Sequence, residues 1–423
     1  MMIVLLPESF SATRFAHDKH ARKIMSLILT RQIDRVAEWR SKEYLSGPPS
    51  KQEYQLSEWA NVSTRELKRI TNDYKDIIIE MVHENILKRN EHYSNCKSKK
   101  FCMSYCLHED LQNDKLFLST INQRKRRRTH KKLKGNFNIY HQRAAGWIDC
   151  FDLPEELVQE YERICCLSEW PDYQRAQVAK LNGKYWWDTV DKFGRYHTPI
   201  SNMNKKLRPY LVCNHGRFTD SRIVGFDFAN FQPSLLDHFS SNDIAIQIPE
   251  KERELYLGLC RRGKIYQYMA DHSFYKTADE AKKALLKMLN NQNHVMTNTT
   301  IWRTFDQFFP TYSQLIQSIK QGGKNSHKRM AKFLQQKESQ IIFDGVVNSF
   351  TKFTNDQIPF FTVHDAVYTV VEAQEKLRTA MEETIQMLKI STTIKQEGGV
   401  IHCSTFHPSY VSMKPQQNLR LSF

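Results

Sequence analysis

Apolar residues in the first part of the chain recur at helical spacing. The stretch RKIMSLILTRQIDRVAEW predicts a helix within residues 1–50, which we expect to form an N-terminal helical segment. This segment ends at SGPPS, residues 46–50, because proline and glycine interrupt a helix. Beyond it, Leu56, Trp59 and Ala60 fit one face of a short predicted helix.

A second short helix is predicted after a turn at Asn61 and Val62. Ser63 and Glu66 have the S-x-x-E spacing of a capping box, in which each side chain accepts a hydrogen bond from a free backbone N–H at the start of a helix. Two short helices around a tight turn have the outline of a helix-turn-helix. The stretch HYSNCKSKKFCMSYCL follows, and it alternates as a β wing would.

This order of elements resembles a winged helix-turn-helix domain, roughly over residues 55–110. The resemblance implies that Arg65, Lys68 and Arg69 on the second helix contact nucleic acid. A helical module that packs on its neighbour is the alternative interpretation, because many three-helix units share the pattern.

The charge of the chain favours a polyanionic partner. The net charge is +16, which points to nucleic acid before an anionic membrane surface. The run QRKRRRTHKKLKG concentrates like charges, so we expect a basic linker over residues 116–140 whose Arg126 and Arg127 contact nucleic-acid phosphates. A nuclear-localisation signal is an alternative interpretation of this run.

The remaining composition is that of a globular protein. Hydrophobic residues make up 40% of the 423 positions, enough for a sizeable core. No stretch approaches about 18 consecutive apolar residues, so no membrane partner is expected. Scattered cysteines predict reduced thiols and a cytoplasmic location, or a nuclear one in a eukaryotic host. Cys96, Cys102 and Cys106 match no standard zinc-ligand spacing, so packing is favoured over zinc binding there.

Two aspartates follow apolar runs in the second half of the chain. Residues 223–226 predict a buried strand that reaches Asp227, and residues 360–363 and 367–371 predict two strands around His364 and Asp365. A buried aspartate is costly unless it pairs or binds a cation. Two aspartates at neighbouring strand ends can hold a pair of divalent ions for phosphoryl transfer, with Mg²⁺ expected and Mn²⁺ as the alternative.

The segments around these aspartates resemble known polymerase motifs. Asp-Phe-Ala-Asn-Phe-Gln, starting at Asp227, resembles motif A of the family A DNA polymerases and their single-subunit relatives, and Val363-His364-Asp365 resembles their motif C. The resemblance is collinear over about residues 190–375 and is closer to compact polymerase-like proteins of plasmids, phages and transposons than to the cellular repair enzyme. It implies that Asp227, Asp365 and the backbone carbonyl of Phe228 bind two magnesium ions, and that His364 orients the primer end; stabilisation of the turn is the alternative role for His364.

Other segments follow the polymerases in the same order. Phe193-Gly194-Arg195 and Arg208 stand where these enzymes carry a Gly-Arg element before motif A. FLQQKESQIIFDGVV resembles the helix before motif C and contributes Gln335. The resemblance implies that Arg195 and Gln335 contact nucleic acid and that Arg208 contacts the nucleotide.

The stretch from Leu255 to Leu289 resembles the polymerase fingers with their lysine-bearing helix. Lys283 and Lys287 lie one helical turn apart, and either could bind a triphosphate, with Lys282 competing for the role and a solvated helix face as the alternative. Gln232 stands where family A carries a glutamate that excludes the ribose 2′-hydroxyl, which favours deoxynucleotides.

Together these expectations describe an α+β protein: a right-hand polymerase with an antiparallel palm sheet and helical fingers, preceded by a helical, winged-helix-like module. The expected boundaries are 51–115 for the winged module, 141–250 for thumb and palm, 251–325 for fingers and 326–423 for the rest of the palm.

The expected function is template-directed nucleotidyl transfer by a DNA polymerase of a mobile element or virus, with primer-template DNA and nucleoside triphosphates as partners. No acidic exonuclease motifs precede residue 190, which predicts no proofreading. Alternatives are an RNA polymerase or primase with RNA as partner, an untemplated nucleotidyltransferase, and a non-enzymatic DNA-binding replication protein.

Overall fold

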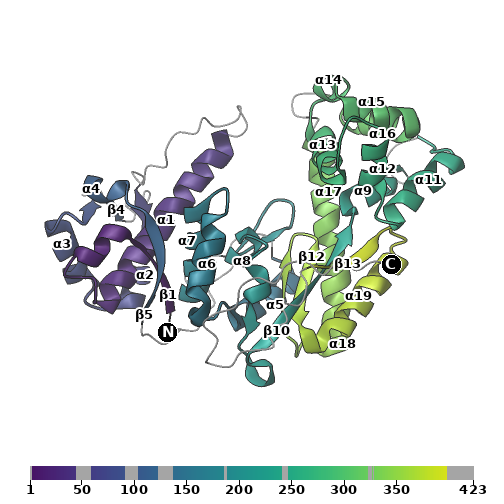
Figure 1. The fold of residues 1–423 in the computed structure, drawn as a ribbon. Helices are drawn as coiled ribbons and strands as arrows, with labels where there is room; N and C mark the ends of the chain where they lie inside the picture. Colours follow the sequence, from purple (N-terminus) through teal and green to yellow (C-terminus); the bar gives the residue numbers. More distant parts are fainter. Residues whose placement is uncertain are drawn as a thin grey trace, which may run out of the picture.

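The computed structural model combines several antiparallel sheets with many helices (Figure 1). It describes residues 2–43, 59–90, 103–121, 137–184, 188–240, 246–322, 326 and 328–397. The described part confirms the α+β class that the sequence predicts.

The N-terminal part is built on a two-stranded ribbon. Strand β1 (Met2–Pro7) is buried along its whole length and pairs with β5 (Leu116–Ile121). Helix α1 (Lys19–Glu43) packs on β1 and on α7 (Pro171–Gly183). The helix predicted from RKIMSLILTRQIDRVAEW is confirmed as α1. The strand β1 before it was not predicted, and the prediction of a linker from residue 116 was wrong, because that stretch begins with β5. Each strand is defined by a partner far along the chain, which local patterns do not show.

A second, three-stranded sheet lies beside α1, in the order β2-β4-β3. The helix predicted across Trp59 and Ala60 is wrong, because Ala60 pairs with Tyr105 of β4. The capping box is confirmed: the N–H of Glu66 donates to Ser63 at 3.3 Å, and the N–H of Ser63 donates to Glu66 at 3.0 Å. The elements are β2 (Ala60–Asn61), α2 (Thr64–Ile70), α3 (Tyr74–His83), β3 (Leu87–Arg89), β4 (Ser104–Leu107) and α4 (Glu109–Gln112).

The largest sheet has the order β11-β12-β10-β9-β6, with β13 also paired to β10. Its strands are β6 (Phe151–Asp152), β9 (Val212–Cys213), β10 (Ser221–Ala229), β11 (Phe360–Val363), β12 (Ala366–Val370) and β13 (Thr393–Glu397). The three strands predicted around the two aspartates are confirmed to within a few residues. β10 lies inside the sheet, where it pairs with β12, β9 and β13, and its Val224, Phe226 and Phe228 side chains are buried.

Helices cover this sheet and extend to one side of it. Helix α19 packs on β12 and on α18, while α5 packs on β11. A π-helical turn over Ile341–Val347 joins α17 to α18. These helices are α5 (Ile139–Trp147), α6 (Val158–Cys166), α8 (Pro199–Asn202), α17 (Lys328–Gln340), α18 (Asn348–Thr354) and α19 (Gln374–Met387).

The described residues between 246 and 322 are helical and contain no strand, and they lie at the upper right of Figure 1. The turn of α9 joins β10 to this helical part, and α12 and α13 pack side by side within it. Before it lie α9 (Phe231–Ser234) and α10 (Asp237–Ser240); its own helices are α11 (Glu250–Arg261), α12 (Ile265–Asp271), α13 (Ala278–Asn290), α14 (Asn293–Met296), α15 (Thr300–Phe308) and α16 (Pro310–Ile319).

Candidate active site

Two aspartates meet where the central sheet borders the helical part. β10 and β12 are antiparallel, with Phe226 opposite Val367. Asp227, the next residue of β10, therefore lies beside the turn before β12, which carries Asp365. Both carboxylates line one cavity of about 530 Å³. His364 at the tip of this turn has a φ of +54°, a left-handed conformation that is unfavourable for residues other than glycine. Such a conformation is maintained where the surrounding structure requires it.

The surroundings of the two carboxyl groups disfavour their ionised forms and so raise their pKa values. Burial raises the pKa of Asp227, although Lys395 and Lys282 oppose the shift. Burial, Glu338 and Asp227 together raise the pKa of Asp365 to about 7. Oδ1 of Asp227 is buried and accepts no hydrogen bond from any described residue. A buried, unpartnered carboxylate oxygen beside a second carboxylate is a suitable place for a cation.

The oxygen donors at this place suit magnesium. Phe228 lines the cavity together with Asp227 and Asp365. Carboxylate oxygens and backbone carbonyl oxygens are hard ligands of the kind that Mg²⁺ prefers. No group of three or more His, Cys, Asp or Glu residues within the described ranges is arranged to hold a metal ion by itself. Magnesium often keeps only one or two protein carboxylates and completes its shell with substrate phosphates and water. The residues therefore fit an ion that binds together with a phosphorylated substrate.

Lysine side chains line the walls of the same cavity. Lys282 of α13 has its Nζ 5.7 Å from the ring centre of Tyr266, which also lines the cavity, while Lys264 and Lys395 reach it from other elements. Lys395 stands opposite Asp227 in the β10–β13 pair. An arrangement of ammonium groups around two carboxylates can bind a polyphosphate with its counter-ions.

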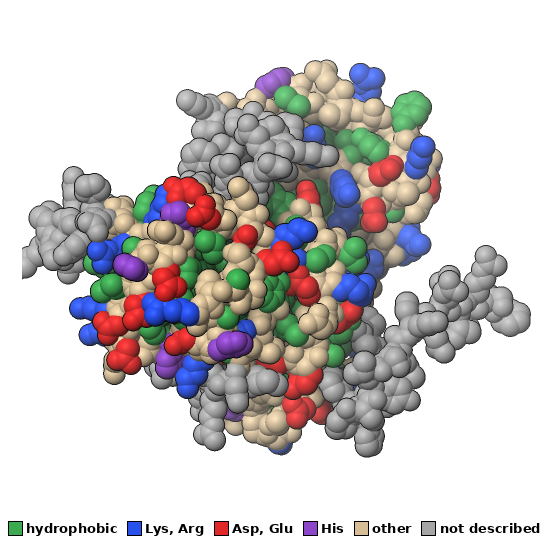
Figure 2. Space-filling model, turned by 60° about the vertical axis from the view of Figure 1, so that its left-hand side comes forward, with side chains coloured by type: hydrophobic (Ala, Val, Ile, Leu, Met, Phe, Trp, Pro, Cys, Tyr) green, Lys and Arg blue, Asp and Glu red, His purple; other side chains and the backbone are tan. Residues whose placement is uncertain are grey.

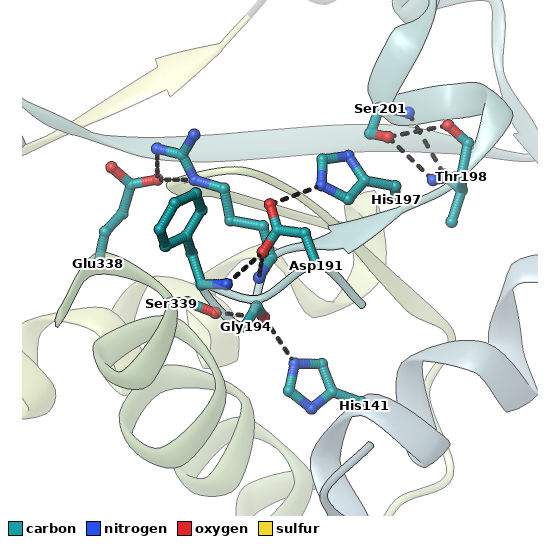
Figure 3. A network of polar contacts seen from close by, with 10 residues as sticks. His141, Asp191, Gly194, His197, Thr198, Ser201, Glu338 and Ser339 are labelled. Atoms are coloured by element: carbon teal, nitrogen blue, oxygen red, sulfur yellow. Dashed lines mark hydrogen bonds and ion pairs between the residues drawn. The ribbon is translucent and has the colours of Figure 1, made fainter. Parts of the chain in front are cut away.

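Arg195 lies on the hairpin of β7 (Thr189–Val190) and β8 (Tyr196–His197). Asp191 accepts hydrogen bonds from the backbone N–H groups of Phe193 at 2.8 Å and Arg195 at 3.0 Å, which fixes the turn (Figure 3). The carbonyl of Gly194 accepts hydrogen bonds from Ser339 and from Nε2 of His141. The guanidinium of Arg195 is thereby held at the wall of the cavity.

His364 has cationic neighbours and stays neutral near physiological pH. Desolvation and the positive charges of Arg195, His197 and Arg208 lower its pKa to about 4. The rings of His197 and His364 are 6.3 Å apart, and His197 in turn contacts Asp191 at 3.0 Å. His364 can therefore offer a neutral donor or acceptor to a molecule in the cavity.

The predicted site residues do not all meet in this cavity. Asp227, Phe228, Gln232, Arg195, His364 and Asp365 line it. Lys283 and Lys287 are exposed on α13 and do not line it, whereas the competing Lys282 does. Gln335 is half-buried on α17 and lies outside the lining. Arg208 donates to the hydroxyl of Tyr368 at 3.1 Å and contacts Glu397 at 3.4 Å instead.

The predicted nucleic-acid contacts lie elsewhere or outside the described residues. Arg65 and Lys68 are exposed on α2, and Arg69 is half-buried there. Arg126, Arg127, Cys96 and Cys102 lie outside the described residues, and Cys106 is buried in β4. The face shown in Figure 2 carries basic and acidic side chains interspersed, without a large area of one sign.

Among the cavity residues that sequence reasoning missed are Glu338, Tyr266, Lys264 and Lys395. Glu338 continues a series of buried positions on α17 that includes Met330 and Leu334, and a carboxylate in such a series was a readable signal. Lys395 had no comparable signal, because only the pairing of β13 with β10 brings it to Asp227.

Comparisons with known proteins add no assignment: no family model matches the sequence, and no curated protein matches it either. None of the helices in the described ranges has the length and apolar character needed to cross a membrane.

Proposed function

We propose that this protein is a template-directed nucleic-acid polymerase, specifically a DNA polymerase of a mobile element or virus. The observation that carries the proposal is the convergence of Asp227, with its unpartnered buried oxygen, and Asp365 in one cavity with lysine walls. Two-metal nucleotidyl transfer needs carboxylates at neighbouring positions and cations for the triphosphate. The order of the resembling sequence motifs, from Arg195 to Asp365, supports the same assignment.

The residues divide the reaction between them. Asp227 and Asp365 would hold magnesium, which when bound lowers the pKa of the primer 3′-hydroxyl and neutralises charge on the leaving pyrophosphate. Lys282 binds the triphosphate of the incoming nucleotide, and Arg195 and His364 contact the primer end. The primer 3′-hydroxyl gives its proton to water, its oxygen attacks the α-phosphate in line, the bond from the α-phosphorus to the bridging oxygen breaks, and pyrophosphate leaves.

Two further features support a nucleic-acid partner. The order α1, β2, α2, α3, β3, β4 with a three-stranded sheet is compatible with the winged helix-turn-helix that the sequence resembles. The net charge of +16 favours binding to a phosphate backbone, so that binding should weaken as salt concentration rises. Gln232 at the cavity wall favours deoxynucleotides as substrates by its bulk.

Primer extension tests the proposal. A labelled primer-template with Mg²⁺ is incubated with dNTPs or NTPs, beside a reaction without template. We expect extension that follows the template with dNTPs, and a loss on the order of a thousandfold in Asp365→Asn, because several kcal/mol of charge stabilisation depend on the metal site. Asp220→Asn is the matched control, since Asp220 is exposed in a turn with a φ of +61° that asparagine tolerates.

Other outcomes of this experiment would contradict the proposal. Extension with NTPs alone would indicate an RNA polymerase or primase, and extension without template would indicate an untemplated nucleotidyltransferase. DNA binding without any extension, unchanged in Asp365→Asn, would indicate a non-enzymatic replication protein.

A further inference from the structure

Glu338 is a buried carboxylate in the cavity wall to which the proposed reaction assigns no role. Its side chain is only 2% exposed. Oε1 accepts two hydrogen bonds from Arg195, at 3.0 Å from Nε and 2.6 Å from Nη2. Oε2 accepts a hydrogen bond from Nε2 of Gln232 at 3.2 Å. A carboxylate this buried is retained only where its hydrogen bonds are well satisfied, as they are here.

The contact with Glu338 determines how the amide of Gln232 is oriented. An ionised carboxylate only accepts hydrogen bonds, so the amide NH₂ of Gln232 must face Glu338. The carbonyl oxygen of that amide is then turned away from Glu338. Gln232 lines the cavity, so its side chain forms part of the wall in one fixed conformation.

The hairpin shown in Figure 3 keeps Glu338 itself in place. Arg195 cannot withdraw from Glu338 easily, because Asp191 binds the backbone of its turn and Ser339, the next residue on α17, binds the carbonyl of Gly194. Two guanidinium nitrogens of Arg195 donate to the same oxygen, Oε1 of Glu338, and such charge-assisted hydrogen bonds are stronger than those between neutral groups. Glu338 thus connects a rigid hairpin to the side-chain amide of Gln232.

We propose that Glu338 is a positioning residue that sets the sugar selectivity of the cavity by holding Gln232 rigid. This inference rests on the proposed function. A nucleotide whose phosphates lie at Asp227, Asp365 and Lys282 places its sugar next to them, within the same cavity that Gln232 lines. A glutamine fixed at Glu338 cannot rotate away from an added 2′-hydroxyl, whereas a free glutamine can.

Two substitutions at position 338 separate rigidity from polarity. Glu338→Ala releases Gln232. In Glu338→Gln, the new carbonyl must face Arg195, which only donates, so the new NH₂ faces Gln232 and the amide of Gln232 turns over to accept from it. The wall then keeps its bulk and stays fixed, but it presents an NH₂ group instead of a carbonyl.

The measured quantity is the preference for dATP over ATP. In binding, the preference is the Kd for ATP divided by the Kd for dATP, measured with Mg²⁺ but without primer-template, so that no turnover occurs. In primer extension, it is the kcat/KM for dATP divided by the kcat/KM for ATP. We expect Glu338→Ala to lower both ratios about three- to tenfold, the effect of one lost hydrogen bond, and Glu338→Gln to keep them. Gln232→Ala should lower both ratios at least as far, and adding Glu338→Ala to Gln232→Ala should have no further effect.

The control is Glu162→Ala, which breaks another partly buried carboxylate–arginine pair, with Arg175, away from the cavity. Its thermal unfolding shows what loss of such a pair does to stability, and its ratios should equal those of the wild type.

Unchanged ratios in Glu338→Ala with an active wild type overturn the inference alone. Lack of extension by the wild type, with selective nucleotide binding, overturns the proposed polymerase function and leaves the role of Glu338 in binding standing. If Glu338→Ala does not fold, reduced ratios in Glu338→Gln overturn the inference, because that variant keeps the wall fixed.

Discussion

Asp365 lies one residue beyond the position directly opposite Asp227, because Phe226 pairs with Val367 in the antiparallel β10–β12 ladder. This relationship brings two carboxylates together from residues far apart in the sequence. Each is desolvated, and the charge of Asp227 contributes to the raised pKa of Asp365. The protein therefore maintains an unfavourable arrangement of charge that a divalent cation would relieve.

Magnesium binding should depend on pH around neutrality. The pKa of Asp365 is about 7, so below that pH a cation must displace a proton, and its apparent affinity should fall about tenfold per pH unit. Isothermal titration in buffers of different ionisation enthalpy measures both the affinity and the released proton. Asp365→Asn should abolish the proton release, and an affinity that stays constant between about pH 6 and pH 8 would contradict the assignment.

The stability of the cation-free protein should also depend on the protonation of Asp365. Cation affinity rises with pH, whereas this stability should fall. The folded pKa of about 7 lies above the ordinary value of 3.8, so the folded state binds the proton more tightly and loses stability as pH rises through that interval. Asp365→Asn removes this loss. We expect the variant to be more stable than the wild type by about 4 kcal/mol above neutral pH, and equal to it below about pH 4. Urea unfolding at the two pH values, without divalent cations, measures the difference.

Lysine substitutions on α13 should have unequal effects on nucleotide use. Lys282 lines the cavity, whereas Lys283 and Lys287 point elsewhere on the same helix. We expect Lys282→Ala to raise the KM for the nucleotide on the order of tenfold or more, the effect of one lost charged hydrogen bond. Lys283→Ala serves as the matched comparison on the neighbouring position. An equal or larger effect of Lys283→Ala would indicate that Lys283, as predicted from the sequence, binds the triphosphate, and not Lys282, which lines the cavity.

Gly194 should tolerate no side chain. Its φ is +85°, and a Cβ atom there would lie 2.9 Å from Oγ of Ser339. Gly194→Ala is therefore expected to destabilise the protein by about 1–3 kcal/mol and to displace Arg195. Thermal unfolding measures the first effect, and the KM for primer-template measures the second. Gly146→Ala is the control, because Gly146 sits in α5 and a Cβ atom added to it would have no described neighbour within 4 Å.

Local sequence signals predicted the parts of the fold that depend on neighbouring residues. The capping box at Ser63 needs only Glu66 three residues later, and the strand that ends near Asp227 is a continuous apolar run. These features are determined within one turn or one strand, so the sequence shows them directly.

Pairings between distant segments could not be predicted in this way. Nothing local distinguishes Ala60 in a strand from Ala60 in a helix; its partner Tyr105 decides. Lys395 reaches Asp227 only through the β10–β13 pair, and the choice of Lys282 over its neighbour depends on how α13 packs on α12. The candidate aspartates were predictable as a pair, but the residues that tune and position them required the tertiary structure.

The exposed cations of α2 should contribute to DNA affinity through phosphates. Arg65 and Lys68 are exposed on this helix, while Glu66 is held on its inner side by Arg31 at 2.7 Å. The helix is thus fixed, with its basic side chains turned outward. Arg65→Ala combined with Lys68→Ala should weaken binding to duplexes of any sequence and reduce the slope of log affinity against log salt by about one for each lost contact. Fluorescence anisotropy over a salt series measures both quantities.

Lys352→Ala, which removes an exposed lysine from α18, should leave the slope unchanged, and an equal loss in both variants would show that α2 has no special part in DNA binding.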